Sequence, residues 1–367
     1  MANPNLGADM KWKKKDIFFM RRCLLLAKKG EGRVSPNPLV GAVLAKGGRA
    51  FGEGYHEFFG GPHAEINAMQ GKNCEGATLY VSLEPCSHCS PEKKTPPCVP
   101  RIIASGIKRV VIATADPNPK VNGMALLRKA GIKVEEGVLS SEAEEMNEPF
   151  FRFMKTKKPF VALKMAQSAD GKIGVHGKGN VRLSGKKFDF YSQTLRNRYD
   201  SILLGVGTIL ADDPRLTCRI KGGRNPARII LDSHLQIPLS ARVLRNAKRE
   251  TVIIAASAQH DVKKAKALRS MGLEVLVCGK EKPSLRTLFA KLPEFNIISV
   301  LVEGGAAIAE AALSEKLVDR AIISVSKKKL GENGTVSSPF SKPKWKRLLY
   351  SFKKTRMGCD TTYEGRL

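Results

Sequence analysis

Apolar and polar residues follow helical and extended patterns in alternation along most of the chain. Residues 16–29 have the amphipathic spacing of a helix that ends at Gly30. Two glycines at 47–48 predict a hairpin turn between two strands. Further helices are predicted after His63, at 99–105 and at 124–130, and strands at 39–44, 50–55, 78–83, 109–114 and 132–136. This alternation predicts an α/β domain.

The same alternation continues after a connecting helix. Ser141 and Glu144 match a capping box, from which we expect a helix that runs towards Phe153. We expect the domain boundary near 146–158 and predict a basic extension (1–15), a first domain (16–150) and a second domain with a basic C-terminal segment (151–367). The strands predicted in the second domain lie at 160–165, 201–204, 228–231, 252–255, 274–277 and 298–302.

Length and composition support packed domains. The chain has 367 residues, which suits two cores better than one, and its apolar share of 42% argues against a wholly disordered chain. No stretch has the roughly 18 to 20 uncharged apolar residues of a spanning helix. The early apolar run at 17–27 contains Arg21 and Arg22 and lacks a signal cleavage site. We therefore expect a cytoplasmic protein, with no membrane partner, whose eight cysteines are thiols or metal ligands.

The charge is strongly positive. Lys and Arg number 63 against 34 Asp and Glu, a formal net charge of +29. Such an excess fits a nucleic acid, an anionic lipid or a phosphorylated substrate, and equally a solvated surface. Residues 327–356 carry ten basic residues and one acidic residue, which we interpret as solvated surface. The net charge alone does not distinguish among these possibilities.

Three short segments of the first half contain residue types that are typical of a catalytic metal site. His63 is followed by Glu65, Cys86 follows Pro85, and Cys98 follows two prolines. One imidazole and two thiolates fill three positions of a tetrahedral zinc ion and leave the fourth for water. A carboxyl group two residues after the histidine can carry protons without binding the metal, as in the zinc nucleobase deaminases. We therefore predict a zinc site with ligands His63, Cys86 and Cys98 and with Glu65 as the catalytic acid and base.

Cys89 competes for the third ligand position. The bare Pro-Cys-x-x-Cys spacing favours Cys89, but Ser90 and Pro91 follow it and break any helix there. Cys98 instead opens an apolar helical segment, where the helix dipole stabilises a thiolate. We choose Cys98 and expect the residues between Cys89 and Thr95 to form an inserted loop.

These motifs resemble the bifunctional deaminase/reductase family of riboflavin biosynthesis. The matching segments are Ser35-Pro36-Asn37-Pro38, Gly54-Tyr55-His56, Gly60-Gly61-Pro62-His63-Ala64-Glu65, Glu84-Pro85-Cys86-Ser87-His88, Thr95-Pro96-Pro97-Cys98 and Asp116-Pro117-Asn118-Pro119. The resemblance implies a cytidine-deaminase-like three-layer first domain. It also implies that Asn37, His56 and His88 hold a pyrimidine ribonucleotide. The stretch between the two cysteines is longer here than is usual in the family.

The second half has weaker local signals. No Gly-x-Gly-x-x-Gly follows a first strand, so the ordinary dinucleotide fingerprint is absent. Gly304 and Gly305 stand where a predicted strand meets a predicted helix, a place where a phosphate can approach backbone N–H groups. A tight turn with no bound phosphate often has the same pair of glycines.

The order of the remaining motifs again resembles the reductase half of that family, which has a dihydrofolate-reductase-like fold. The resemblance implies that the substrate meets Lys164, Asn180, Arg196, Leu216, Arg219 and Glu303. It implies that NADPH meets Ala166, Arg182, Thr208, Asp212, Ser233, Gly305, Ala306 and Ala307. Arg182 is a departure, because the family usually has an aromatic residue there. An arginine can stack on or pair with NADPH, or it can mark weakened binding.

The leading hypothesis is therefore a two-step enzyme with zinc and NADPH as cofactors. Its first domain deaminates a diaminopyrimidine ribosylamino 5′-phosphate, and its second reduces the ribosyl group to ribityl. One alternative is a nucleic-acid-editing deaminase, which leaves the second half unexplained; another is a deaminase with an inactive reductase half. We expect a small-molecule substrate and no nucleic acid. The sequence does not fix the oligomeric state, and a homo-oligomer is compatible with it.

Overall fold

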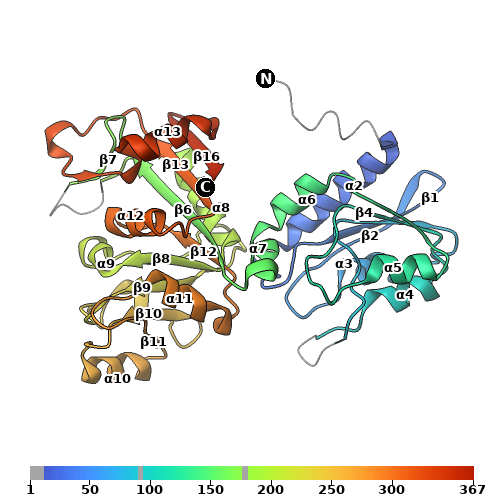
Figure 1. Ribbon diagram of the computed structural model, residues 1–367, viewed down its shortest axis with the longest axis horizontal. Helices are drawn as coiled ribbons and strands as arrows, with labels where there is room; N and C mark the ends of the chain where they lie inside the picture. The colour runs from blue at the N-terminus through green and yellow to red at the C-terminus, as the bar shows by residue number, and fades with distance from the viewer. Residues whose placement is uncertain (1–11, 90–93, 176–180) are drawn as a thin grey trace. The chain divides into compact units, whose positions relative to one another are not determined.

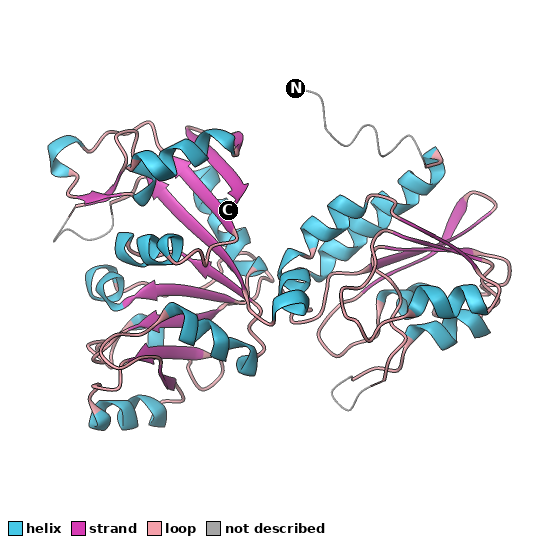
Figure 2. Cartoon of the chain, in the orientation of Figure 1, coloured by secondary structure: helices cyan, strands magenta, loops and turns pink. Residues whose placement is uncertain are grey.

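The computed structural model describes residues 12–89, 94–175 and 181–367. The chain divides into two compact units, Met1–Lys157 and Lys158–Leu367 (Figure 1). Each unit is an α/β structure, as the alternating pattern predicts (Figure 2). No helix among the described residues is long and apolar enough to cross a membrane.

The first unit is built on a five-stranded sheet of order β2-β1-β3-β4-β5. Strands β1 and β2 form the hairpin expected at the two glycines, β1 also pairs antiparallel with β3, and β3, β4 and β5 are parallel. The strands are β1 (Gly41–Lys46), β2 (Arg49–Tyr55), β3 (Thr78–Val81), β4 (Arg109–Ile112) and β5 (Lys133–Glu136). The helices are α2 (Lys14–Ala27), α3 (Ala64–Met69), α4 (Cys98–Ala104), α5 (Gly123–Lys129), α6 (Ser140–Met146) and α7 (Glu148–Thr156), with a 3-10 turn at Lys28–Gly30.

Helices cover both faces of this sheet. A Cβ on Gly41 would lie 2.0 Å from the carbonyl oxygen of Cys23 in α2, so α2 packs directly on one face. A Cβ on Gly54 would lie 2.4 Å from the backbone nitrogen of Ala68 in α3. Gly54 pairs with Ala42, the neighbour of Gly41 in β1, and successive residues of a strand face opposite ways. Helices α2 and α3 therefore lie on opposite faces and make a three-layer domain.

The connection to the second unit differs from its prediction. The helix α6 begins after Leu139 and has no side-chain cap, so Ser141 and Glu144 do not form the expected capping box. The Glu144 carboxylate instead accepts from the Thr114 hydroxyl at 3.1 Å. The expected single helix is divided at Asn147, whose side chain accepts from the Leu39 N–H and donates to the Leu39 carbonyl. Because α7 continues without a break to Thr156, the division between the units falls after Lys157, which lies inside the expected range 146–158 but beyond residue 150.

The second unit contains a nine-stranded sheet of order β11-β10-β9-β8-β12-β6-β13-β16-β15 among its described residues. The strands from β11 to β13 in this order are parallel to one another, β16 is antiparallel to β13, and β15 is antiparallel to β16. The strands are β6 (Phe160–Gln167), β8 (Ser201–Gly205), β9 (Ala227–Leu231), β10 (Val252–Ala256), β11 (Glu274–Val277), β12 (Ser299–Val302), β13 (Arg320–Val325), β15 (Lys353–Met357) and β16 (Asp360–Arg366), and β7 (Lys172–Gly174) pairs with β14 (Val336–Ser337) outside this sheet. The helices are α8 (Lys186–Arg198), α9 (Val206–Asp212), α10 (Val262–Ser270), α11 (Leu285–Lys291), α12 (Ala306–Ser314) and α13 (Pro343–Ser351). Successive residues of the central strands enter the cores on the two faces of the sheet, which is why these strands read as continuous apolar runs.

The basic C-terminal segment is part of this fold. All ten of its basic side chains between 327 and 356 are exposed, in agreement with a solvated surface. The apolar residues between them, Phe340, Trp345, Leu349 and Phe352, are buried in the core of the second unit. The segment thus contributes a helix and an edge strand as well as charge. Lysines on an open edge strand also oppose pairing with another chain.

Candidate functional site

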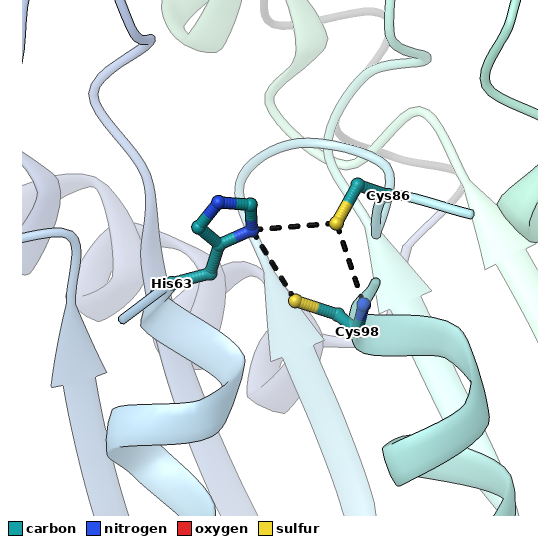
Figure 3. A group of neighbouring side chains, drawn as sticks. All are labelled: His63, Cys86 and Cys98. Atoms are coloured by element: carbon teal, nitrogen blue, oxygen red, sulfur yellow. Dashed lines mark hydrogen bonds between the residues drawn. The ribbon is translucent and has the colours of Figure 1, made fainter. Parts of the chain in front are cut away.

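The first site lies where α3, the end of β3 and α4 approach one another. His63 stands immediately before α3, Cys86 follows β3, and Cys98 is the first residue of α4. The Nδ1 atom of His63 lies 3.3 Å from the Sγ of Cys86 and 3.3 Å from the Sγ of Cys98 (Figure 3). The Cys98 N–H is 3.3 Å from the Cys86 sulfur, so the two thiols lie against the same helix N-terminus.

This donor set fits zinc. Among the described residues these three side chains form a group whose ligand atoms all lie within 4.8 Å of one another. Two vertices of a tetrahedral zinc site are roughly 3.6 Å apart for nitrogen and sulfur ligands, close to the spacing found here. The other ring nitrogen of His63, Nε2, is 3.0 Å from the Thr95 hydroxyl, which fixes the ring orientation. Cys89 is exposed and stands outside this group.

Glu65 is buried beside the three candidate ligands. It lies in the first turn of α3 and is 3% exposed. Burial raises the pKa of its carboxyl above the ordinary value. A buried carboxyl that can hold a proton suits general acid and base chemistry.

His56 and Asn37 form a hydrogen-bonded pair in the same cavity. The Nδ1 of His56 lies 3.0 Å from the carbonyl oxygen of Pro62, and its Nε2 lies 3.0 Å from the Asn37 amide nitrogen. Because a carbonyl can only accept, Nδ1 donates and Nε2 accepts from the Asn37 amide. Burial lowers the pKa of His56, so the ring is held neutral. The amide oxygen of Asn37 is then free of this pair and can face a ligand.

A cavity of about 320 Å³ joins these groups. Its lining includes the predicted site residues Asn37, His56, His63, Glu65, Cys86 and His88. It also includes Lys94 and Asp116, which are not among the predicted site residues. Burial raises the pKa of Asp116 to about 6. Asp116 follows β4 and Cys86 follows β3, and the carboxyl ends of adjacent parallel strands meet at one edge, a signal that could have identified it.

The second site lies at the carboxyl ends of four neighbouring parallel strands. Lys164 and Ala166 lie on β6, Thr208 follows β8 in α9, and Ser233 follows β9. Glu303 follows β12, which lies between β8 and β6. The sequence spreads these residues over more than a hundred positions, and the sheet brings them to one edge. This edge is where open parallel sheets bind their ligands.

Glu303 is the charged centre of this edge. Its carboxylate accepts two hydrogen bonds from the Arg196 guanidinium, at 3.0 and 2.7 Å, and lies 4.0 Å from the Lys164 ammonium. Burial alone would raise the pKa of Glu303, but Lys164 and Arg196 outweigh it and the pKa lies below the ordinary value. Glu303 therefore remains an anion, and the Arg196 guanidinium fixes the position of its carboxylate.

The loop with Leu216 and Arg219 is fastened to α8. The Arg219 N–H donates to the Gln193 side chain at 3.0 Å, and Arg196 donates to the Thr217 carbonyl at 3.2 Å. Leu216 is buried with a φ of 55°, while the Arg219 side chain is exposed. Unlike Arg196, Arg219 thus faces solvent.

The glycine pair forms a close turn before α12. A Cβ on Gly304 would lie 2.5 Å from the Cβ of Leu204, so no larger residue fits. Gly305 has a φ of 62°, and nothing lies within 4 Å of where its Cβ would be. Gly305 and Ala307 are exposed and Ala306 is partly exposed, so the start of this nine-residue helix is open to a ligand. An open helix N-terminus at a strand end fits the phosphates of NADPH.

Two of the expected cofactor residues, Arg182 and Asp212, are exposed. The Arg182 side chain is 69% exposed, and its guanidinium pairs with Asp189 at 2.8 Å. Asp212 is exposed at the end of α9. Asn180 lies outside the described residues.

Two family models match the chain. The model described as the cytidine and deoxycytidylate deaminase zinc-binding region matches residues 13–114, and the model described as the RibD C-terminal domain matches residues 159–361. Together they match most of both structural units. The zinc-binding region contains His63, Glu65, Cys86 and Cys98.

Named relatives and solved structures agree with these models. The riboflavin biosynthesis protein RibD of Aquifex aeolicus is 41% identical over 322 residues, which cover 86% of this chain and 88% of that protein. The Escherichia coli RibD is 36% identical, covering 87% and 89%. The diaminohydroxyphosphoribosylaminopyrimidine deaminase/5-amino-6-(5-phosphoribosylamino)uracil reductase of Thermotoga maritima has a TM-score of 0.80 at 39% identity, covering 96% of this chain and 98% of that one. Acinetobacter baumannii RibD has a TM-score of 0.85 at 32% identity, with the same coverage.

The match extends over both halves at once. A nucleic-acid-editing deaminase accounts for the first half only, so this alternative is not favoured. The predicted two-domain α/β fold, with a cytidine-deaminase-like half and a dihydrofolate-reductase-like half, is confirmed. The chain belongs to the RibD family of bifunctional riboflavin-biosynthesis enzymes, in which a zinc-dependent deaminase domain precedes an NADPH-dependent reductase domain.

Proposed function

We propose that the first domain deaminates 2,5-diamino-6-ribosylamino-4(3H)-pyrimidinone 5′-phosphate and that the second reduces the ribosyl group of the product to ribityl. The observation that carries this proposal is the cluster of His63, Cys86 and Cys98, of which His63 and Cys86 line one cavity together with Glu65, in a chain that also has the reductase edge. The substrate assignment is supported by the printed activity of the Thermotoga relative.

His63, Cys86 and Cys98 would hold the zinc ion. Bound zinc supplies a Lewis acid that lowers the pKa of a water molecule towards neutrality. Glu65 takes a proton from the attacking water and delivers it to the amino nitrogen. The oxygen bonds to the ring carbon, the carbon–nitrogen bond breaks, and ammonia leaves. Glu65 lies in the first turn of α3 beside the three ligands, a position from which its carboxyl can carry the proton between the two steps.

The other groups of the cavity bind and orient the substrate. The neutral His56 holds the Asn37 amide, whose oxygen then accepts from the pyrimidine. His88 and Asp116 supply further polar contacts. Among the described residues that line the cavity, Lys94 is the one Lys or Arg, so we assign it to the substrate's 5′-phosphate.

In the second domain NADPH supplies the hydride. The backbone N–H groups at Gly305, Ala306 and Ala307, together with the Thr208 and Ser233 hydroxyls, bind its phosphates and ribose. Glu303 accepts from sugar hydroxyls of the substrate, since Lys164 and Arg196 keep it ionised. Arg219, which is exposed, pairs with the substrate phosphate.

A coupled assay tests both halves in one preparation. The zinc-loaded protein is incubated with the diaminopyrimidine nucleotide and NADPH, while ammonia release and absorbance of the nicotinamide band are followed. We expect one NADPH oxidised for each ammonia released. Ammonia without NADPH oxidation would instead indicate an inactive reductase half. Deamination of tRNA or single-stranded DNA, with none of the nucleotide, would contradict the proposal.

Two expectations from the sequence stay predictions: a homo-oligomeric state and a cytoplasmic location.

A further inference from the structure

The loop between the two cysteine ligands is fastened to the segment that precedes His63. Eleven residues separate Cys86 from Cys98. Near the end of this stretch, the Thr95 hydroxyl lies 3.0 Å from His63 Nε2, and the Lys94 ammonium lies 4.2 Å from the centre of the Phe59 ring. Two successive loop residues therefore contact the same segment, one by a hydrogen bond and one by a cation–π contact.

Phe59 and Gly60 form a surface that fits this lysine. A Cβ on Gly60 would lie 2.8 Å from the Cδ of Lys94, so the absence of a side chain there makes room for the lysine stem. Gly60 also has a φ of 84°, which a side chain disfavours. The Phe59 N–H donates to the Arg33 carbonyl at 2.9 Å, which fixes the backbone under the ring. The aliphatic stem thus lies over a glycine and the ammonium over an anchored ring.

The contact matters because of where Lys94 stands. Lys94 and Phe59 both line the cavity that holds His63, Cys86 and Glu65. A lysine side chain has many rotamers, and holding it in one place removes part of the entropy cost of binding an anion. An aromatic ring can do this while leaving the ammonium charged and its N–H groups available.

We propose that Phe59 is a positioning residue that holds the Lys94 ammonium against the 5′-phosphate of the deaminase substrate. This inference rests on the proposed function, which assigns the phosphate to Lys94. The contact between Phe59 and Lys94 also attaches the long loop between Cys86 and Cys98 near its C-terminal end. A glycine at position 60 is then required because the aliphatic stem of Lys94 passes over it.

The test compares aromatic and aliphatic residues at position 59. Phe59→Leu should raise the deaminase KM about two- to fivefold, with kcat changed less than twofold, because an exposed cation–π contact is of this size. Phe59→Tyr should keep the KM of the unchanged protein. With the substrate that lacks the 5′-phosphate, all three proteins should have equal KM values. Phe58→Leu is the matched control, since Phe58 is 53% exposed and does not line the cavity.

A double-mutant cycle separates this inference from the function on which it rests. Lys94→Met should raise the KM for the phosphorylated substrate by more than Phe59→Leu does, and adding Phe59→Leu to it should have no further effect. If Lys94→Met leaves the KM unchanged, the phosphate assignment in the proposed function is wrong. If Lys94→Met raises the KM but Phe59→Leu does not, only the role of Phe59 is wrong. Zinc content and reductase activity report whether each variant is folded, and Phe59→Met replaces the leucine variant if that one loses zinc.

Discussion

The two sites each contain a buried glutamate, and the two glutamates differ in their electrostatic surroundings. Glu65 is buried next to the candidate zinc ligands, and burial raises the pKa of its carboxyl. The Glu303 side chain is only 8% exposed, yet Lys164 and Arg196 lower its pKa. A carboxyl that accepts a proton easily suits proton transfer, whereas one held as an anion suits binding of hydroxyl groups. Burial alone therefore does not tell the role of a carboxyl; its charged neighbours do.

The two sites also differ in how the chain assembles them. Residues of the deaminase site come from short motifs, each of which sets two or three groups a few residues apart. Residues of the reductase site come from the ends of β6, β8, β9 and β12, which lie far apart in the sequence. The first arrangement leaves a clear signal in the sequence, and the second depends on strand order. If the two sites work independently, a substitution in one should leave the activity of the other unchanged.

The largest expected effect is loss of the metal site. Cys98→Ala should abolish zinc binding and lower deamination more than about 1000-fold, since a three-ligand zinc site cannot lose a ligand without losing its metal. Reduction of the already deaminated substrate should change less than twofold. Metal quantification and separate assays of the two steps measure this.

Cys89→Ala is the matched control for that variant, because Cys89 is exposed and outside the cluster. It should keep zinc and both activities. Loss of zinc in Cys89→Ala and its retention in Cys98→Ala would reverse the ligand assignment.

The second effect concerns the reductase site. Arg196→Ala removes the guanidinium that donates two hydrogen bonds to the buried Glu303 and should lower the reductase kcat/KM about 100-fold, a loss of about 3 kcal/mol of transition-state stabilisation. Deamination should be unaffected. Arg198→Ala, at an exposed position of the same helix, is the control and should keep both activities. Equal losses in the two activities would show that Arg196 acts through general stability instead.

The third effect is a shift in pH dependence. The pKa of Glu303 lies below its ordinary value partly because of Lys164, so Lys164→Met should raise it. The carboxylate is then protonated at higher pH, and the acidic limb of the reductase kcat/KM profile should move up by about one pH unit. The deaminase profile should not move. An unshifted limb, with activity merely reduced, would mean that Glu303 is not the group that titrates.

The smallest effect is expected at Arg182. Its guanidinium is largely exposed and paired with Asp189, and such surface pairs contribute about 0 to 1 kcal/mol. Arg182→Ala should therefore change the KM for NADPH less than about threefold. A rise of tenfold or more, measured at saturating substrate, would indicate that Arg182 leaves Asp189 to bind NADPH.

Much of the fold could be predicted because it depends on local patterns. The hairpin at Gly47–Gly48 and six parallel strands of the second domain, β6 and β8 to β12, follow from runs of apolar residues and from turn residues. The sequence prediction omits β13, although Ala321, Ile322 and Ile323 form an apolar run in it. It also omits β15 and β16, because basic and polar residues interrupt their patterns and long-range pairing stabilises them. The capping box at Ser141 was wrong for a related reason: the Asn147 side chain binds the distant Leu39 backbone and divides the helix there.

The sequence by itself determined the donor types of the metal site, the choice of Cys98 over Cys89 as its predicted ligand, and the family. These conclusions depend on residue types and on short spacings, both of which are visible in the sequence without knowledge of the fold. Only the tertiary structure decided that Lys164 and Arg196 lie beside Glu303 and keep it ionised. It also decided that Asp116 and Lys94 line the deaminase cavity and that Phe59 lies under Lys94. The physical reason is that these properties arise from charges and surfaces brought together across the sheet and loops, where sequence distance carries no information about contact.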